Sequence, residues 1–171
     1  MTTKMNRKGI SNVVATIILI AVAIALAVAV AIWVFGLAGS ASKTATLQVQ
    51  AVGLTGVSSG SSATLTLLIS NPSSSGISIN GFTLGSLSCV FSQLVQVPAG
   101  TQGGQLQITL QITNGAFSGV SGVSGSGGII VPSGTSASCI GSQTAAVGIQ
   151  YSGYLTTVSG QTYPFTVTAS S

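Results

Sequence analysis

The feature that most constrains this chain is one long apolar segment near its N-terminus. No charged side chain occurs between Lys8 and Lys43, and residues 10–38 are almost wholly apolar. As an α-helix this stretch would be about 43 Å long, whereas about 20 apolar residues are enough to cross a bilayer. The sequence therefore predicts an N-terminal helix over residues 10–42 that is long enough to span a membrane.

The centre of this segment alternates with a period of two. Residues 21–32 read AVAIALAVAVAI, a pattern that by itself also fits a strand, but the length and the lack of any break favour a helix. The expected helix carries two nearly opposite alanine ridges, Ala21, Ala25 and Ala29 on one side and Ala23, Ala27 and Ala31 on the other. Small residues spaced by four let apolar helices approach closely, which predicts neighbours on several sides. The alternative is that Ala and Val only make a generic membrane span.

The few charged residues predict the orientation of this helix. They are Lys4, Arg7, Lys8 and Lys43. Since positive residues before the apolar segment outnumber those after it, the N-terminus is expected in the cytoplasm and the rest of the chain outside. Trp33 and Phe35 lie where an interfacial aromatic belt is expected.

The composition excludes most kinds of chemistry. The chain has no Asp, Glu or His and only two Cys among 171 residues. Carboxylate pairs, Ser-His-Asp triads and Cys-His pairs are therefore impossible within the chain, and a metal site lacks ligands. The positive charges are too few for a nucleic-acid surface. We expect a protein that is not an enzyme and that binds no cofactor, metal or nucleic acid.

Residues 43–171 are rich in Ser, Thr, Gly and Gln, with short runs of alternating hydrophobicity. Such runs predict strands near residues 47–51, 65–69, 106–112, 147–151 and 165–169. Turns are expected at Asn71-Pro72, Asn80-Gly81 and Asn114-Gly115, and the Gly/Ser segment 118–128 is expected to be a flexible loop. Seven or more short strands in about 130 residues predict an all-β immunoglobulin-like sandwich as the outer domain.

Cys89 and Cys139 both fall in this outer domain, where disulfides persist. A bridge between them would close a loop of about 50 residues and contribute about 4 kcal/mol in the chain-entropy model. The alternative is two buried free thiols.

The Ser and Thr residues and the three tyrosines can each be explained either by structure alone or by a function. The many Ser and Thr residues either carry O-linked sugars or only supply polar strand faces, whereas Pro72 blocks the single N-glycosylation-like triplet at Asn71. Tyr151, Tyr154 and Tyr163 either form a sugar-stacking surface or cap the sandwich core with their hydroxyls at its edge.

The segment Arg7-Lys8-Gly9-Ile10-Ser11, followed directly by the apolar run, closely resembles the start of archaeal type IV pilins. The basic pair, the glycine and the helix match the class III leader of that family. The resemblance implies that residues 1–9 are a leader peptide, which a membrane prepilin peptidase removes between Gly9 and Ile10. The helix then survives in the mature subunit and forms the filament core. Val14 stands where bacterial relatives carry a glutamate implicated in subunit docking. An assembly mechanism that uses an N-terminal salt bridge would therefore lack its acidic side chain in this chain.

The resemblance implies a structural subunit of an extracellular pilus that serves adhesion. The implied partners are identical subunits, the prepilin peptidase, an assembly ATPase and a membrane platform protein, with the precursor held in the cytoplasmic membrane. Two alternatives remain open. One is a filament subunit of the archaellum, which shares the leader and serves motility. The other is a membrane-tethered module that binds sugars or other surface ligands and never polymerises.

Overall fold

The computed structural model describes the backbone of residues 7–42 and 46–171 and, within the helix, the side chains of residues 11–36. The chain divides into two compact units, Met1–Ser42 and Lys43–Ser171. Residues 1–6 of the expected leader and residues 43–45, which include Lys43, lie outside the described residues. We call the second unit the head.

The first unit is a single α-helix, α1 (Arg7–Ser42), in place of the strand that the period-2 alternation also allowed. No proline interrupts the 36 residues of this helix, so every backbone N–H after its first turn can bond to the carbonyl four residues earlier. The many alanines have the highest intrinsic helix propensity, which offsets the lower propensity of the Val and Ile residues between them. The helix therefore extends three residues upstream of the predicted start at Ile10 and ends at the predicted residue, Ser42.

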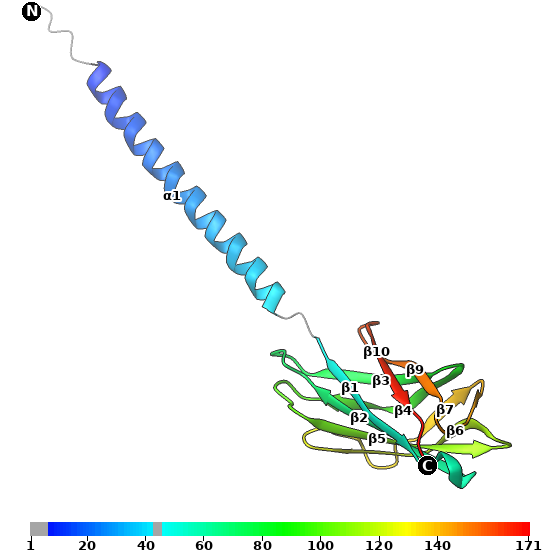
Figure 1. Ribbon diagram of the computed structural model, residues 1–171. Coiled ribbons are helices and arrows are strands. Elements are labelled where there is room, and N and C mark those ends of the chain that lie inside the picture. The colour runs from blue at the N-terminus through cyan, green and yellow to red at the C-terminus, as the bar shows by residue number, and fades with distance from the viewer. Residues whose placement is uncertain (1–6, 43–45) are drawn as a thin grey trace, which may run out of the picture. The chain divides into compact units, whose positions relative to one another are not determined.

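The head is all-β, with one short 3-10 turn, and its strands form two antiparallel five-stranded sheets (Figure 1). The first sheet has the order β1-β2-β5-β6-β8 and the second the order β10-β9-β3-β4-β7. The elements are β1 (Gln48–Thr55), η1 (Val57–Ser59), β2 (Ser62–Ser70), β3 (Ile77–Leu84), β4 (Leu87–Val97), β5 (Gly104–Thr113), β6 (Ala116–Ser126), β7 (Ala137–Ile140), β8 (Gln143–Thr144), β9 (Gln150–Thr157) and β10 (Thr162–Thr168). The fold is thus a long N-terminal apolar helix followed by an immunoglobulin-like β-sandwich.

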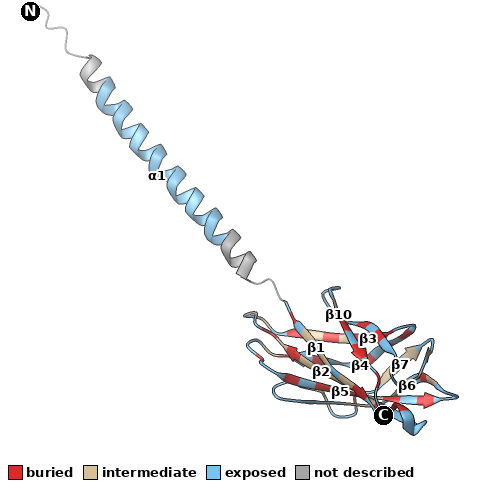
Figure 2. Ribbon diagram, in the orientation of Figure 1, coloured by how far each residue is buried: buried red, intermediate tan, exposed pale blue. Residues whose placement is uncertain are grey.

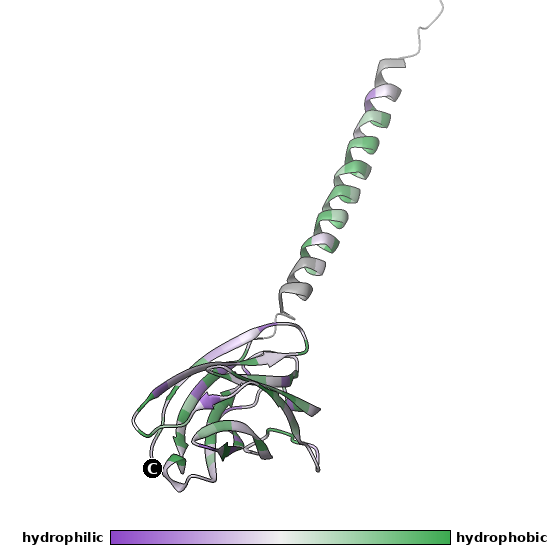
Figure 3. Cartoon of the chain, turned by 90° about the vertical axis from the view of Figure 1, so that its right-hand side faces the viewer, coloured by the Kyte–Doolittle hydropathy of each residue, from purple (hydrophilic) through white to green (hydrophobic). Residues whose placement is uncertain are grey.

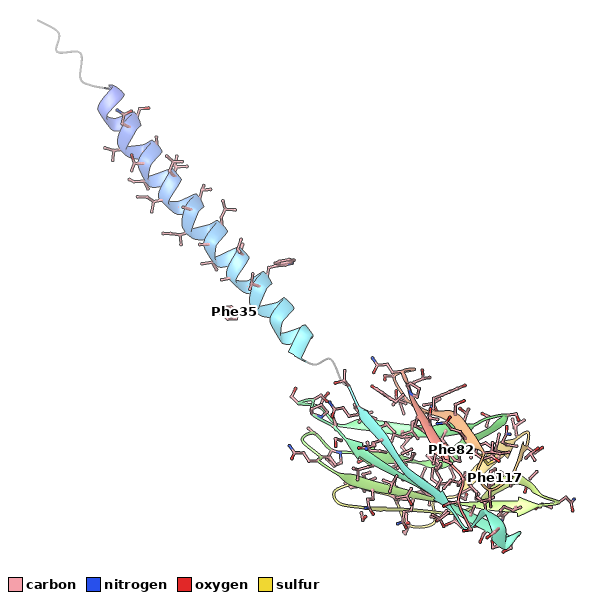
Figure 4. The ribbon with its side chains drawn as sticks, in the orientation of Figure 1. Phe35, Phe82 and Phe117 are labelled. Carbon is pink, nitrogen blue, oxygen red and sulfur yellow. A yellow bond between two sulfur atoms is a disulfide. The ribbon has the colours of Figure 1, made fainter. Side chains whose placement is uncertain are left out.

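The two sheets enclose one hydrophobic core. Alternate residues of the strands are buried, as the period of a strand requires, and Phe82 and Phe117 are the largest fully buried side chains (Figures 2 and 4). Every buried hydrophobic residue of the described chain lies between Leu47 and Ala169, so helix α1 contributes nothing to this core. The head therefore contains all the buried apolar surface that its own folding requires.

The segment expected to be a flexible loop is instead strand β6, which was the main error of the sequence-based prediction. The strand pairs with β5 from Gln105↔Ser126 to Thr113↔Ala116, and two register shifts interrupt the pairing. Its inward residues are Phe117, Val120 and Val123, which pair with Ile112, Leu110 and Ile108. The bulges change the spacing of inward residues from two to three, so the strand has no alternating hydrophobic pattern that a sequence could reveal.

Asn80-Gly81 is not a turn but lies inside β3, where the pairing with β4 and β9 shifts register. A Cβ atom on Gly81 would lie 2.4 Å from the carbonyl oxygen of Cys89, so glycine permits close approach of two strands here. The other two turn predictions are correct. Asn71-Pro72 ends β2, and Asn114-Gly115 joins β5 to β6 with φ angles of 52° and 75°.

The predicted strand near residues 147–151 begins later than expected. Strand β9 starts at Gln150, and Val147 and Ile149 lie before it with about half of each side chain exposed. The chain end after β10 closes the sandwich beside β1, where Ala169 forms a parallel bridge with Leu54 and the Ser170 amide donates to the Leu54 carbonyl at 2.8 Å.

Candidate assembly surface and head-domain sites

Helix α1 presents a continuous apolar surface with no polar stripe. All described side chains from Ser11 to Gly36 are exposed, and this stretch of 26 residues is long and apolar enough to cross a membrane (Figures 2 and 3). The aromatic side chains of Trp33 and Phe35 are exposed near the C-terminal end of this stretch, and Phe35 is labelled in Figure 4. Because the apolar face surrounds the helix, one partner on one side cannot cover it.

Thr16 is the only hydroxyl between Val13 and Phe35, and its hydrogen bond is made within the helix. Its Oγ1 donates to the Asn12 carbonyl oxygen at 2.8 Å. A hydroxyl that bonds one turn back exposes no unpaired donor to an apolar environment. The helix can therefore enter lipid or a bundle of helices without burying an unsatisfied side-chain donor at this position.

The regular geometry of α1 places the two alanine rows on different sides of the helix. Residues four apart differ by about 40° around the axis and residues two apart by about 200°. Ala21, Ala25 and Ala29 therefore form one shallow row, and Ala23, Ala27 and Ala31 form the other. The larger side chains between them, such as Leu26 and Val28, stand well exposed. Each row is a strip where the backbone of a neighbour can come close.

The four residues of the predicted leader cleavage site, Arg7, Lys8, Gly9 and Ile10, form the first turn of α1. Their side chains lie outside the described residues. The N–H groups of a first helical turn have no intrahelical acceptors, and helix ends fray. The peptide bond between Gly9 and Ile10 therefore belongs to the part of α1 that opens at the lowest cost.

The two cysteines form a disulfide bridge in the head. Cys89 and Cys139 are directly paired residues of β4 and β7, with Cα atoms 4.0 Å apart and a sequence separation of 50. Cys89 is buried in the core. Strand β7 has only four residues and lies at the edge of its sheet, so the bridge ties a short edge strand to the centre of the sandwich.

The three tyrosines do not share a surface. Tyr151 faces the core, where its hydroxyl accepts a hydrogen bond from the Ala146 amide and its ring lies edge-on to Phe117 at 5.7 Å. Tyr154, three residues later on the same strand, points outward and is 41% exposed. Tyr163 is half-buried, and its hydroxyl donates to Gln161 Oε1 at 2.7 Å. Strand alternation separates Tyr151 from Tyr154 and does not support a joint sugar-stacking surface.

A polar hollow at one end of the head was missed by the sequence analysis. It has a volume of about 430 Å³ and lies where the first residue of β1, the turn after β2 and the loop before β5 meet. Its lining includes Gln48, Ser70, Asn71, Thr101 and Gln102. The turn at Asn71-Pro72 was the only sequence signal near this hollow. The hollow itself could not be predicted, since no local pattern shows that these three segments meet.

Comparison of the sequence with protein-family models and with curated proteins found no match.

Proposed function

We propose that this chain is a structural subunit of an extracellular filament of the archaeal type IV pilus kind. In this proposal copies of helix α1 pack side by side as the apolar core of the filament, and the β-sandwich heads form its exterior. The chain performs no chemical step. The filament serves attachment to surfaces or to other cells.

The apolar surface of α1 is the observation that carries this proposal. Side chains from Val13 to Phe35 are exposed on every side of the helix, and apolar surface in water costs about 25 cal/mol per Å². The helix therefore needs lipid before assembly and other helices after it. Since lipid and a bundle are both apolar, close packing along the alanine rows supplies the preference for the bundle.

The head has properties that suit the exterior of a filament. It has its own core and a disulfide, which is a feature of proteins outside the reducing cytoplasm. It carries no charged side chain between residues 44 and 171, so neighbouring heads meet without electrostatic repulsion between side chains.

The proposed partners follow from the leader at Arg7-Lys8-Gly9. A membrane prepilin peptidase cleaves before Ile10 and removes the positive residues that hold the N-terminus at the cytoplasmic face. An assembly ATPase and a membrane platform protein then move the subunit out of the membrane into the filament. Before cleavage the subunit resides in the cytoplasmic membrane.

The test is the N-terminus and the assembly state of the protein recovered from sheared cell surfaces. The proposal predicts filaments in negative-stain electron microscopy whose subunit begins at Ile10. A variant with Gly9→Leu should accumulate as uncleaved precursor in the membrane and yield no filaments, while Thr3→Ala, six residues upstream, should behave as the unmodified protein.

Each other outcome points to a different function. A monomeric protein that keeps Met1 would overturn the proposal in favour of a tethered surface module, and a start near Ser42 would favour a secreted domain. Loss of swimming in a deletion strain that retains attachment would indicate an archaellum subunit.

A further inference from the structure

The polar hollow at the end of the head has the dimensions of a small-molecule site. Its volume of about 430 Å³ lies within the range of about 300–1,000 Å³ that ligand pockets occupy. A second hollow, which Ser78 and Gln96 help to line, has a volume of about 260 Å³ and falls below this range. The larger hollow is therefore the better candidate for a bound molecule.

Hydrogen bonds hold the walls of the larger hollow in place. Asn71 is fully buried, and its Nδ2 donates to the carbonyl oxygens of Ser75 at 2.9 Å, Val97 at 3.1 Å and Pro98 at 3.2 Å. The Asn71 amide also donates to the Thr101 carbonyl at 2.8 Å. These bonds tie the turn after β2 to the loop before β5, so the hollow exists before any ligand enters.

The rim of the hollow carries side chains with unused hydrogen-bonding capacity. Gln48 and Gln102 both line it, and within the part of the chain that the structure describes neither carboxamide has a hydrogen-bond partner. Ser70 Oγ accepts a bond from the Gly103 amide at 3.1 Å, which leaves its own hydrogen available to donate. Pro72 adds an apolar surface beside these groups.

We propose that this hollow binds a neutral saccharide ring. A carboxamide donates and accepts at once, so two of them can each engage a pair of neighbouring hydroxyl groups. The Pro72 ring offers an apolar surface to the C–H face of the sugar. No charged side chain occurs after Lys43, so the site offers no ion pair to a charged ligand. The ligand class is therefore an uncharged hexopyranose, free or at the end of a glycan.

This inference extends the adhesive role of the proposed filament but is independent of assembly, because every lining residue belongs to the head. The only Lys and Arg residues are Lys4, Arg7, Lys8 and Lys43, so trypsin can release residues 44–171 without cutting them. Since the head has a complete core of its own, this fragment can be studied in solution. Filament formation and sugar binding can then fail separately.

The experiment is a titration of the ¹⁵N-labelled head, followed by backbone amide shifts. The probes are the methyl glycosides of glucose, mannose and galactose, with glucuronate as the charged analogue and glycerol as a hydroxylated molecule without a ring. We expect saturable shifts of the amides of Gln48, Gly100, Thr101 and Gln102 with at least one neutral glycoside, on the order of millimolar affinity, and none with glucuronate or glycerol.

Variants of the lining residues test whether the glycoside binds in the hollow. Gln48→Ala and Gln102→Ala should each weaken binding about tenfold, the loss expected for one or two hydrogen bonds. Gln107→Ala removes the same group from an exposed position on β5 and should leave affinity unchanged. Shifts of similar size with glycerol, shifts at amides away from the hollow, or equal effects of all three variants would overturn the proposal, as would the absence of shifts with every glycoside.

Discussion

At the scale of single residues, buried polar side chains of the head bond mainly to backbone groups rather than to charges, and among the described residues only Asn80 Oδ1 and Thr83 Oγ1 are buried side-chain atoms without a partner. Asn71 and Tyr151 show this most clearly. The Asn71 carboxamide donates to three carbonyl oxygens and accepts from the Ser73 amide. The Tyr151 hydroxyl lies between the Ala146 amide and the Thr144 carbonyl and so links β9 to the end of β8. Buried polar groups cost free energy only when left unpaired.

The Tyr151 hydroxyl is expected to stabilise the head measurably. Tyr151→Phe leaves the Ala146 amide and the Thr144 carbonyl without this partner, and we expect a loss of about 1–3 kcal/mol in the free energy of unfolding. Tyr154→Phe removes an exposed hydroxyl from the same strand and should change stability by less than about 0.5 kcal/mol. Urea unfolding of both variants measures the difference, and equal values would show that the Tyr151 bonds contribute nothing.

Asn71→Asp should introduce pH dependence into the head. One oxygen of the new carboxylate would face the carbonyls of Ser75, Val97 and Pro98, none of which can donate. These acceptors disfavour the charged form, so the pKa of the new carboxyl in the folded state should rise above its unfolded value of about 3.9. Stability should then be closest to that of the unmodified head below about pH 4 and fall as pH rises through the folded pKa.

Thermal unfolding of the Asn71→Asp variant at pH 3 and pH 7 tests this sign. Asn114→Asp is the matched control, because Asn114 is exposed in the turn between β5 and β6. A variant at Asn71 that is more stable at pH 7 than at pH 3 would contradict the assigned amide orientation.

At the scale of elements, the strands of the head bury their apolar side chains, whereas helix α1 leaves its apolar side chains exposed. Strands β2 and β5 bury alternate residues against the opposite sheet, and the residues between them, mainly Thr in β2 and Gln in β5, are half-buried or exposed. Helix α1 exposes apolar residues on all sides and has no partner within the described chain. The strands therefore complete a core within one copy of the chain, whereas the helix needs other molecules to cover it.

The alanine rows give the proposed bundle its close contacts. Ala25→Leu adds bulk to one row, and we expect a large loss of filament yield, because overpacking a close interface costs about 1–3 kcal/mol per site and each subunit repeats it. Val28→Leu, between the rows, adds only one methylene and should be tolerated. Precursor in the membrane should be equal for both, since Leu is at least as apolar as Ala. Filaments of normal yield from Ala25→Leu would show that the row is only a generic span.

The disulfide holds the short edge strand β7. Replacing Cys89 and Cys139 together by Ala should cost up to about 4 kcal/mol for a loop of this length and should speed hydrogen exchange of the amides of β7 more than those of β5. Denaturation and exchange measurements on the head, oxidised and doubly substituted, test both effects. If the amides of β7 and β5 are equally protected from exchange in the doubly substituted head, hydrogen bonding to β4 alone keeps β7 in place.

At the scale of the whole molecule, the absence of Asp, Glu and His should make folding almost insensitive to acid. Acid unfolding comes mainly from carboxylates and histidines that bind protons differently in the folded and unfolded states. Between residues 46 and 171 the titratable side chains are three tyrosines and two bridged cysteines. With no difference in bound protons, the slope of stability against pH is close to zero from about pH 1 to about pH 8.

Melting of the head across this pH range, at constant ionic strength, measures the slope. We expect a nearly constant Tm. A fall of many degrees at pH 2 would show that some group in the head takes up protons on unfolding, which the composition does not allow for.

The amino-acid sequence alone determined the division of the chain, the helix, the all-β class and the approximate positions of β1, β2, β5, β9 and β10. Each of these follows from local patterns: an unbroken apolar run, alternation as in β5, and turn residues such as Asn114-Gly115. Such patterns report directly which side of an element avoids water.

Only the tertiary structure decided the role of β6, the place of Gly81 and the polar hollow. Bulges removed the alternation from β6, and Gly81 lets β3 lie close both to β4, the next strand along the chain, and to β9, which is distant in sequence. Gln48, Asn71 and Gln102 come together through the closure of the sandwich. Contacts between distant segments leave no periodic trace in any one of them, so they become visible only when the sheets are assembled.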